Sequence, residues 1–178
     1  MTTLVFIDGN DLRLAEVTQI IDGADVSAEA LTAGFATSAP EPGQKARDKV
    51  AAHPVSEICF AEAVDITTME GKSLRLELDS ENANRFCKWW RETPAKVELR
   101  VALRRSAEGD IEIFSATCEG RIADKPAGPL ILGWDRLFVP TGEVTTLAQL
   151  SEAGVVVPFR REVYGQLATA LGLMPRGA

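Results

Sequence analysis

Hydrophobic and polar positions at the start of the chain predict a strand, a tight loop and a helix. Residues 4–8, LVFID, form the short apolar run typical of a buried strand, and the Gly-Asn pair after it is typical of a turn. Apolar residues then recur at nearly helical spacing from Leu12 to Ile21, and the Asp-Gly pair at 22–23 ends the predicted helix.

The rest of the chain alternates between strand and helix patterns. Apolar runs or period-two alternation predict strands at 30–36, 55–68, 73–79, 96–106, 110–123 and 137–139. Helical patterns lie at 45–53, 81–92, 145–152 and 159–172. The strands on either side of the AEGD turn are expected to form an antiparallel hairpin. The predicted fold class is α/β with a mixed, partly antiparallel sheet.

Composition narrows the organisation and the classes of partner. The 178 residues, 46% of them hydrophobic, are enough for one core, so we expect one domain of two lobes. A net charge of −7 and a pI near 4.8 argue against a partner that is nucleic acid or an anionic membrane, since both require a basic surface. A small phosphorylated ligand is compatible with this charge.

Cysteine spacing and hydropathy indicate the compartment. Three widely separated cysteines form neither a disulfide framework nor a zinc site, which favours a reducing, cytoplasmic location. The sequence has no 18-residue apolar span and no signal-like start, so we expect neither export nor membrane insertion.

Several kinds of site are disfavoured by the residues present. The single histidine, His53, lies beside a proline at a predicted helix end and is expected at the surface or in a capping role. The EGKS stretch lacks the earlier glycine of a P-loop. Sites built from carboxylates and cationic side chains remain possible. Glu41 and Asp79 suit Mg²⁺, which prefers hard oxygen ligands.

Four cations are candidates for contact with a polyphosphate: Arg13, Lys88, Arg160 and Arg161. They lie near the starts or on the faces of predicted helices. The alternative is that each is a solvated surface charge, which is the commoner state of Lys and Arg.

Two stretches carry a resemblance to a known family. VFIDGNDLRLAEV at the start and CEGRIADKPAGPLILGWDRLFVPTGEVTTLAQL in the last third resemble, in order, segments of the inosine triphosphate pyrophosphatase family. The resemblance implies a Mg²⁺-dependent homodimeric enzyme that hydrolyses nucleoside triphosphates such as ITP and XTP to the monophosphate and pyrophosphate. It also implies a single domain over residues 1–178, with two lobes around an elongated mixed sheet flanked by helices and a central cleft.

The resemblance assigns roles to particular residues. Asn10 and Arg13 match positions that meet the triphosphate, with Asp8 where a hydroxyl residue is usual. Trp134 and Asp135 match a loop that closes on the purine, where the Trp shapes the pocket and the Asp reads or orients the base. The alternative is a buried Trp beside an Asp that caps a turn.

LELDSENANRFCKWW resembles the family's metal-site strand and the phosphate-binding helix after it. Asp79 is thereby expected to bind Mg²⁺ and to orient or deprotonate the attacking water, and Lys88 to contact phosphate. Glu41 is the candidate for the second metal carboxylate. Arg13, Lys88 and Arg160 are expected to neutralise charge on the phosphoryl oxygens.

The chain departs from the family pattern at the positions that contact the nucleotide base. Pro158, Phe159 and Arg160 stand where the family has Ser-His-Arg, and Leu132 replaces a Phe before Gly-Trp-Asp. A Lys usual before the Ser-His-Arg motif is missing. These changes predict altered base selectivity, with Phe159 and Arg160 retained as substrate contacts. Two alternatives are a catalytically weak nucleotide-binding or sensor homologue and an enzyme specialised for a modified nucleotide.

Overall fold

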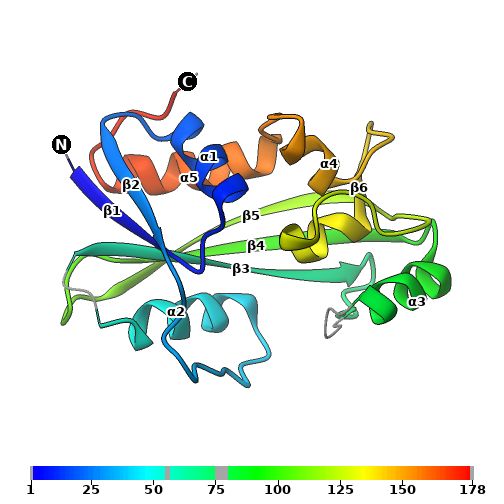
Figure 1. Ribbon diagram of the computed structural model, residues 1–178, viewed down its shortest axis with the longest axis horizontal. Coiled ribbons are helices and arrows are strands. Elements are labelled where there is room, and N and C mark those ends of the chain that lie inside the picture. Colours follow the sequence, from blue (N-terminus) through cyan, green and yellow to red (C-terminus); the bar gives the residue numbers. More distant parts are fainter. Residues whose placement is uncertain (1, 55–56, 75–79, 177–178) are drawn as a thin grey trace. The chain divides into compact units, whose positions relative to one another are not determined.

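The computed structural model describes residues 2–54, 57–74 and 80–176 (Figure 1). Within these residues the strands are β1 (Thr2–Ile7), β2 (Ala24–Glu29), β3 (Ile58–Thr68), β4 (Pro94–Arg104), β5 (Ile111–Ile122) and β6 (Phe138–Pro140). The helices are α1 (Asp11–Ile20), α2 (Pro42–Ala52), α3 (Ser80–Trp90), α4 (Leu147–Glu152) and α5 (Pro158–Ala170), with a 3-10 helix η1 (Leu130–Leu137).

The strands form one mixed sheet in the order β2-β1-β3-β4-β5-β6. β1 pairs in parallel with both β2 and β3, and β5 pairs antiparallel with β6. α1 connects β1 to β2 and α2 precedes β3, as parallel pairing requires a crossover connection. The predicted α/β fold with a mixed sheet is confirmed.

The chain divides into two compact units. The first unit comprises Met1–Ala63, Leu99–Ala116 and Pro158–Ala178, and the second comprises Val64–Glu98 and Thr117–Val157. β3, β4 and β5 contribute residues to both. The central cleft implied by the family resemblance stays a prediction.

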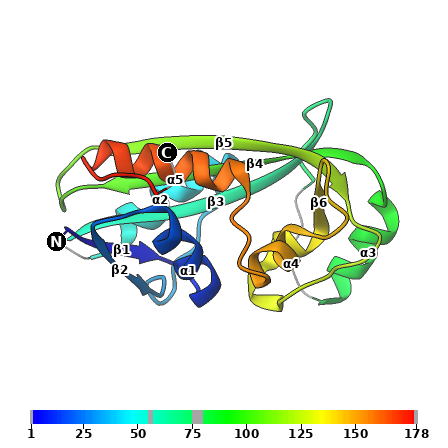
Figure 2. The ribbon, with the colours of Figure 1, turned by 90° about the horizontal axis from the view of Figure 1, so that it is seen from above.

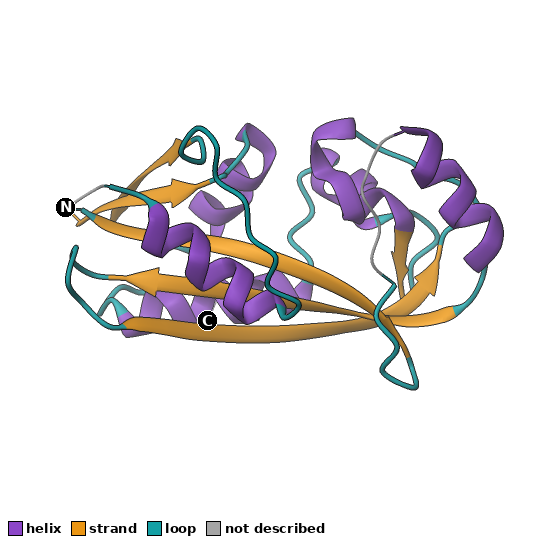
Figure 3. Cartoon of the chain, turned by 90° about the horizontal axis from the view of Figure 1, so that it is seen from below, coloured by secondary structure: helices purple, strands orange, loops and turns teal. Residues whose placement is uncertain are grey.

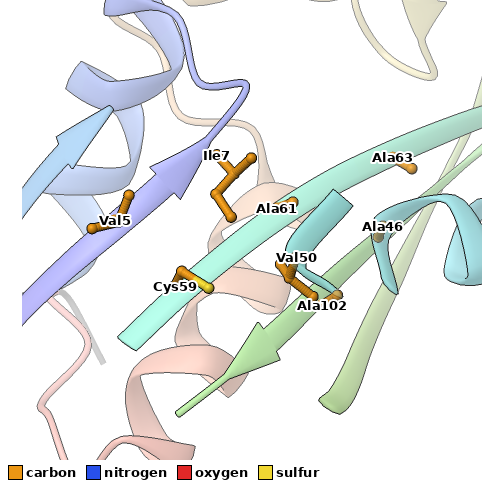
Figure 4. Close-up of a cluster of buried hydrophobic side chains, with 8 residues drawn as sticks. All are labelled: Val5, Ile7, Ala46, Val50, Cys59, Ala61, Ala63 and Ala102. Atoms are coloured by element: carbon orange, nitrogen blue, oxygen red, sulfur yellow. The ribbon is translucent and has the colours of Figure 1, made fainter. Parts of the chain in front are cut away.

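Alternation along β1 and β3 gives the first unit its two faces. One face packs on α2 and forms a hydrophobic cluster, drawn in Figure 4, of Val5, Ile7, Ala46, Val50, Cys59, Ala61, Ala63 and Ala102. Because successive side chains of a strand point to opposite faces, Phe6, Phe60 and Glu62 point away from α2. α1 and α5 cover that other face (Figure 1, Figure 3). The ring of Phe60 stacks on Phe6 with centroids 4.6 Å apart and meets the edge of Tyr164 at 6.2 Å.

The second unit is organised around η1. α4 packs against η1 and β6 (Figure 2). A capping box begins α4: the Thr146 hydroxyl accepts a hydrogen bond from the backbone N–H of Gln149, and the Gln149 side chain accepts one from the Thr146 N–H. Thr146 also donates to the carbonyl of Ala127 at 2.8 Å, which ties α4 to the preceding loop.

One expectation from the sequence is wrong. The strand predicted at 30–36 is absent, and β2 lies earlier, at Ala24–Glu29. β2 forms one end of the strand order and has no buried residue, so backbone pairing with β1 holds it without an apolar pattern that a sequence reading can detect. His53 follows α2 as its C-cap, which confirms the capping role expected for it; it is 6% exposed, and its Nε2 lies 3.4 Å from a Glu29 carboxylate oxygen. Residues 75–79 of the predicted strand at 73–79 lie outside the described residues.

Candidate active site

The turn between β1 and α1 brings a strained backbone and a helix cap together. Asp8 has a positive φ of 62°, and a Cβ on Gly9 would lie 2.6 Å from the Phe6 ring, so only glycine fits there without a shift. Asn10 is the N-cap of α1, and its side-chain oxygen accepts a hydrogen bond from the backbone N–H of Arg13 at 3.0 Å. The acidic Asp8 pairs with Lys49, whose Nζ lies 2.7 Å from Oδ2.

A buried group of charged side chains follows directly from this turn; we call Arg13, Glu16, Glu62, Arg160 and Tyr164 the Glu62 cluster. Oε2 of Glu62 accepts hydrogen bonds from Arg160 at 3.2 Å and from the Tyr164 hydroxyl at 2.6 Å. Oε1 of Glu62 lies 3.4 Å from Nε of Arg13. Arg13 also donates to Glu16, which lies 3.9 Å from Nε of Arg160.

The Glu62 cluster is almost entirely out of contact with solvent. Arg13, Glu16 and Arg160 are 1–3% exposed, whereas the Glu62 side chain is 17% exposed. Oε1 of Glu16 is buried and accepts no hydrogen bond from the described residues, so it remains an acceptor for water or for a donor on a ligand. Lys49 joins the cluster at its edge by donating to the backbone carbonyl of Glu62 at 3.0 Å.

Opposite charges within the cluster favour the ionised forms of Glu62 and Arg160. Burial pulls the pKa of Glu62 upward, but Arg160, Arg13 and the Tyr164 hydroxyl together hold that pKa below its usual value. Burial would lower the pKa of Arg160, yet the carboxylates of Glu62 and Glu16 raise it. The pKa of Arg13 is lowered, by burial and then by repulsion from Arg160. Burial and the charge of Glu62 raise the pKa of Tyr164 well above 10.

The structure thus brings several predicted site residues together in the first unit. Arg13 and Arg160 both contact Glu62, and Asn10 caps the helix that carries Arg13. Phe159 is 4% exposed, and the Arg160 guanidinium lies 5.2 Å from the centre of its ring. Glu41 is exposed just before α2 and makes no capping hydrogen bond. No described contact joins Glu41 to the Glu62 cluster.

The remaining predicted residues belong to the second unit. Trp134, half-buried in η1, meets the ring of Phe86 on α3 edge-on, with centroids 5.7 Å apart. Asp135 beside it is 3% exposed. Lys88 is exposed in the last turn of α3. Asp79, the expected metal ligand and base, lies outside the described residues.

Sequence reasoning missed three members of the Glu62 cluster, although each left a signal. Glu62 interrupts the apolar start of β3, where a charge has to find a partner. Glu16 follows Arg13 by three residues and Tyr164 follows Arg160 by four, so each pair shares a helix face. Arg161, in contrast, is exposed and donates to the backbone carbonyl of Arg176.

Comparison with known proteins places the chain in a family. The sequence profile of the Ham1 family matches residues 64–154, just over half of the chain. The chain belongs to the Ham1 family. The matched region includes the Trp134–Asp135 pair, and the resemblance stated from the sequence is thereby confirmed.

Two curated relatives match this Ham1 chain. The inosine triphosphate pyrophosphatase of Yarrowia lipolytica is 26% identical over 160 residues, covering 84% of this chain and 85% of that protein. A dITP/XTP pyrophosphatase from Hyperthermus butylicus is 40% identical over 50 residues, covering 28% of this chain and 25% of that protein.

Solved structures of Ham1 proteins share the fold. A HAM1 protein from Coxiella burnetii has a TM-score of 0.71 at 19% identity, with 97% of this chain and 99% of that chain covered. The Staphylococcus aureus Ham1 protein has a TM-score of 0.65 at 17% identity, with 95% and 98% covered. No helix within the described residues is long and apolar enough to cross a membrane.

Proposed function

We propose that this Ham1 chain is a nucleoside triphosphate pyrophosphatase that releases pyrophosphate and a nucleoside monophosphate. Its broader class, a hydrolase acting on phosphoanhydride bonds, is confirmed by the family match and by the names of both relatives. The observation in the structure that most supports the proposal is the convergence of Arg13 and Arg160 on Glu62 beside the turn at Asn10.

The chemistry follows from those side chains. Attack of water on the α-phosphorus breaks the bond to the β-phosphate, and charge grows on the phosphoryl oxygens. Arg13 and Arg160 are oriented by Glu62 and carry a guanidinium, the group that binds phosphate oxygens in pairs. We assign them, with Lys88, to neutralise that charge. Asp79 is assigned to orient the attacking water.

Mg²⁺ is the metal proposed for this reaction. This ion takes one or two carboxylates and completes its shell with substrate phosphates and water. Mg²⁺ is assigned to Asp79, and the exposed carboxylate of Glu41 is assigned as its second ligand. When bound, the ion would polarise the phosphate chain.

Altered base selectivity is also proposed. Leu132, in place of an aromatic residue, is 6% exposed and therefore packs within the second unit. Phe159, in place of a histidine, is buried with Arg160 against its ring, and a phenyl group donates no hydrogen bond to a base. The proposal further includes a homodimer and a cytoplasmic location. Cys59, Cys87 and Cys118 are free thiols, which supports a reducing compartment.

The test is pyrophosphate release with Mg²⁺ across ITP, XTP, the common ribo- and deoxynucleoside triphosphates and several modified ones. We expect release that is lost in Asp79→Asn and retained in Asp110→Asn, a matched change at an exposed carboxylate. Full activity of Asp79→Asn would refute the assignment of the base. If the folded wild-type protein releases no pyrophosphate from any nucleotide of the panel, the proposed reaction on these substrates is refuted.

A second candidate function is nucleotide binding without efficient turnover. The specific observation is that Arg13 and Arg160 are buried and already neutralised by Glu62 and Glu16, so a phosphate has to compete with these carboxylates. Calorimetry distinguishes the two functions. Binding of a triphosphate without pyrophosphate release supports the second, whereas turnover above about 1 per second supports the enzyme.

A further inference from the structure

A pocket of about 220 Å³ lies within the second unit, between the segment 72–74 and one face of α3. Its lining residues are Lys72, Ser73, Leu74, Asn82, Arg85, Phe86, Trp89 and Trp90. The five that belong to α3 are Asn82, the pair Arg85–Phe86 and the pair Trp89–Trp90; each group follows the one before it by three or four residues, so they lie along one side of the helix. None of them was assigned to the proposed reaction, and Lys88 on the same helix does not line the pocket.

The lining of the pocket combines buried apolar side chains with an exposed indole. Leu74 and Phe86 are 4% and 5% exposed, and the ring of Phe86 meets that of Trp134 edge-on. Trp89, in contrast, is 73% exposed. An indole left in water at the mouth of a pocket offers a large flat surface for stacking at little cost in side-chain entropy.

Charge at the pocket is opposite to that of the whole chain. The net charge of the protein is −7, yet the described residues that line the pocket include Lys72 and Arg85 and no carboxylate. The Lys72 ammonium lies 5.3 Å from the centre of the Trp90 ring, and the Arg85 guanidinium lies 5.9 Å from the centre of the Trp89 ring. These cation–π contacts hold both cations beside the indoles, where they attract an anion.

We propose that this pocket binds a flat aromatic ring that carries a negative charge. The ring would stack on Trp89, and its anionic group would meet Lys72 and Arg85. A volume of about 220 Å³ is below the roughly 300–1,000 Å³ typical of sites for drug-sized ligands, so the pocket suits one small ring system. The site does not depend on the proposed hydrolysis, because it uses none of the residues assigned to that reaction.

Three small molecules test the stacking of the ring and the attraction of the negative charge separately. Phenyl phosphate carries both ring and charge, cyclohexyl phosphate carries the charge without an aromatic ring, and benzyl alcohol carries the ring without the charge. Binding is measured by calorimetry and by quenching of tryptophan fluorescence. We expect phenyl phosphate to bind more tightly than either of the other two, and its binding to weaken as salt is raised. Equal affinity for phenyl and cyclohexyl phosphate would overturn the stacking role of Trp89.

Variants locate the binding. Trp89→Ala should weaken phenyl phosphate binding about fivefold or more, the lower end of what losing one stacked aromatic ring costs. Lys72→Gln should weaken binding of both phosphates and leave benzyl alcohol unchanged. The controls are Leu130→Ala and Lys125→Gln, which make matched changes at exposed positions of the same unit outside the pocket.

Trp89 is mostly exposed, so its truncation is expected to leave the fold intact. A loss of binding in Trp89→Ala therefore reports on the pocket and not on unfolding. Loss of binding in Trp89→Ala and Lys72→Gln, with both controls unchanged, supports the site. Binding that survives both variants places the probe elsewhere, for example at the phosphate-binding arginines, and overturns the proposal. Absence of phenyl phosphate binding to the wild-type protein overturns it as well. Pyrophosphate release is scored separately and does not enter this result.

Discussion

Replacing Tyr164 with Phe tests whether the Glu62 cluster stabilises the first unit. The Tyr164 ring is fully buried and its hydroxyl donates a 2.6 Å hydrogen bond to Glu62, which remains ionised. A hydrogen bond to a charged group contributes about 1.5–3 kcal/mol. Removal of one oxygen leaves no cavity of methyl size, so no further packing cost is added. We expect Tyr164→Phe to lower the free energy of unfolding by about 2 kcal/mol at neutral pH.

The assay is urea unfolding of both proteins at pH 7. Thr169→Val is the control, because it deletes an exposed hydroxyl on the same helix and is expected to change stability by less than about 0.5 kcal/mol. Repeating the measurement in a Glu62→Gln background completes a double-mutant cycle, and the effect of Tyr164→Phe should shrink there. An effect of Tyr164→Phe no larger than the control, or one unchanged without the Glu62 charge, would refute the reasoning.

The remaining predictions concern pH, thiols and a close backbone contact. The pKa of Glu62 is lowered on folding, so the ionised carboxylate contributes fully to the free energy of unfolding above its ordinary pKa of 4.5. This contribution is lost as the pH falls through the pKa of the folded state. Acid unfolding curves of wild type and Glu62→Gln should therefore converge as the pH falls through that range. Burial raises the pKa of Cys87 to about 11, so iodoacetamide at pH 8 should label the partly exposed Cys118 and spare Cys87, as read by peptide mass spectrometry. Gly120→Ala would place a Cβ 2.2 Å from the Val139 carbonyl oxygen, so the free energy of unfolding, measured by thermal unfolding, should fall by more than about 2 kcal/mol. An unchanged thermal midpoint of the variant would contradict this close contact.

Local patterns were sufficient for most of the secondary structure. The helix from Leu12 to Ile21 and the strands on either side of the AEGD turn were predicted correctly because their periodicity reports burial on one face. β2 was missed because its side chains are not buried, and its position depends on backbone pairing with β1. A strand of that kind has no sequence signal of its own.

The sequence by itself determined the family and the α/β class, since the Gly-Trp-Asp segment and the opening Gly-Asn turn keep their order and spacing. Only the tertiary structure decided what the candidate residues touch. Glu62 meets Arg160 and Tyr164 across 98 and 102 residues of sequence, and alternation along β3 turns it toward the helices that carry those partners. The charge of a side chain follows from its residue type, but its burial and its partners are decided when distant segments pack together. For that reason Arg13 and Arg160, expected as phosphate-binding cations, prove to be buried and paired with the same carboxylate, Glu62.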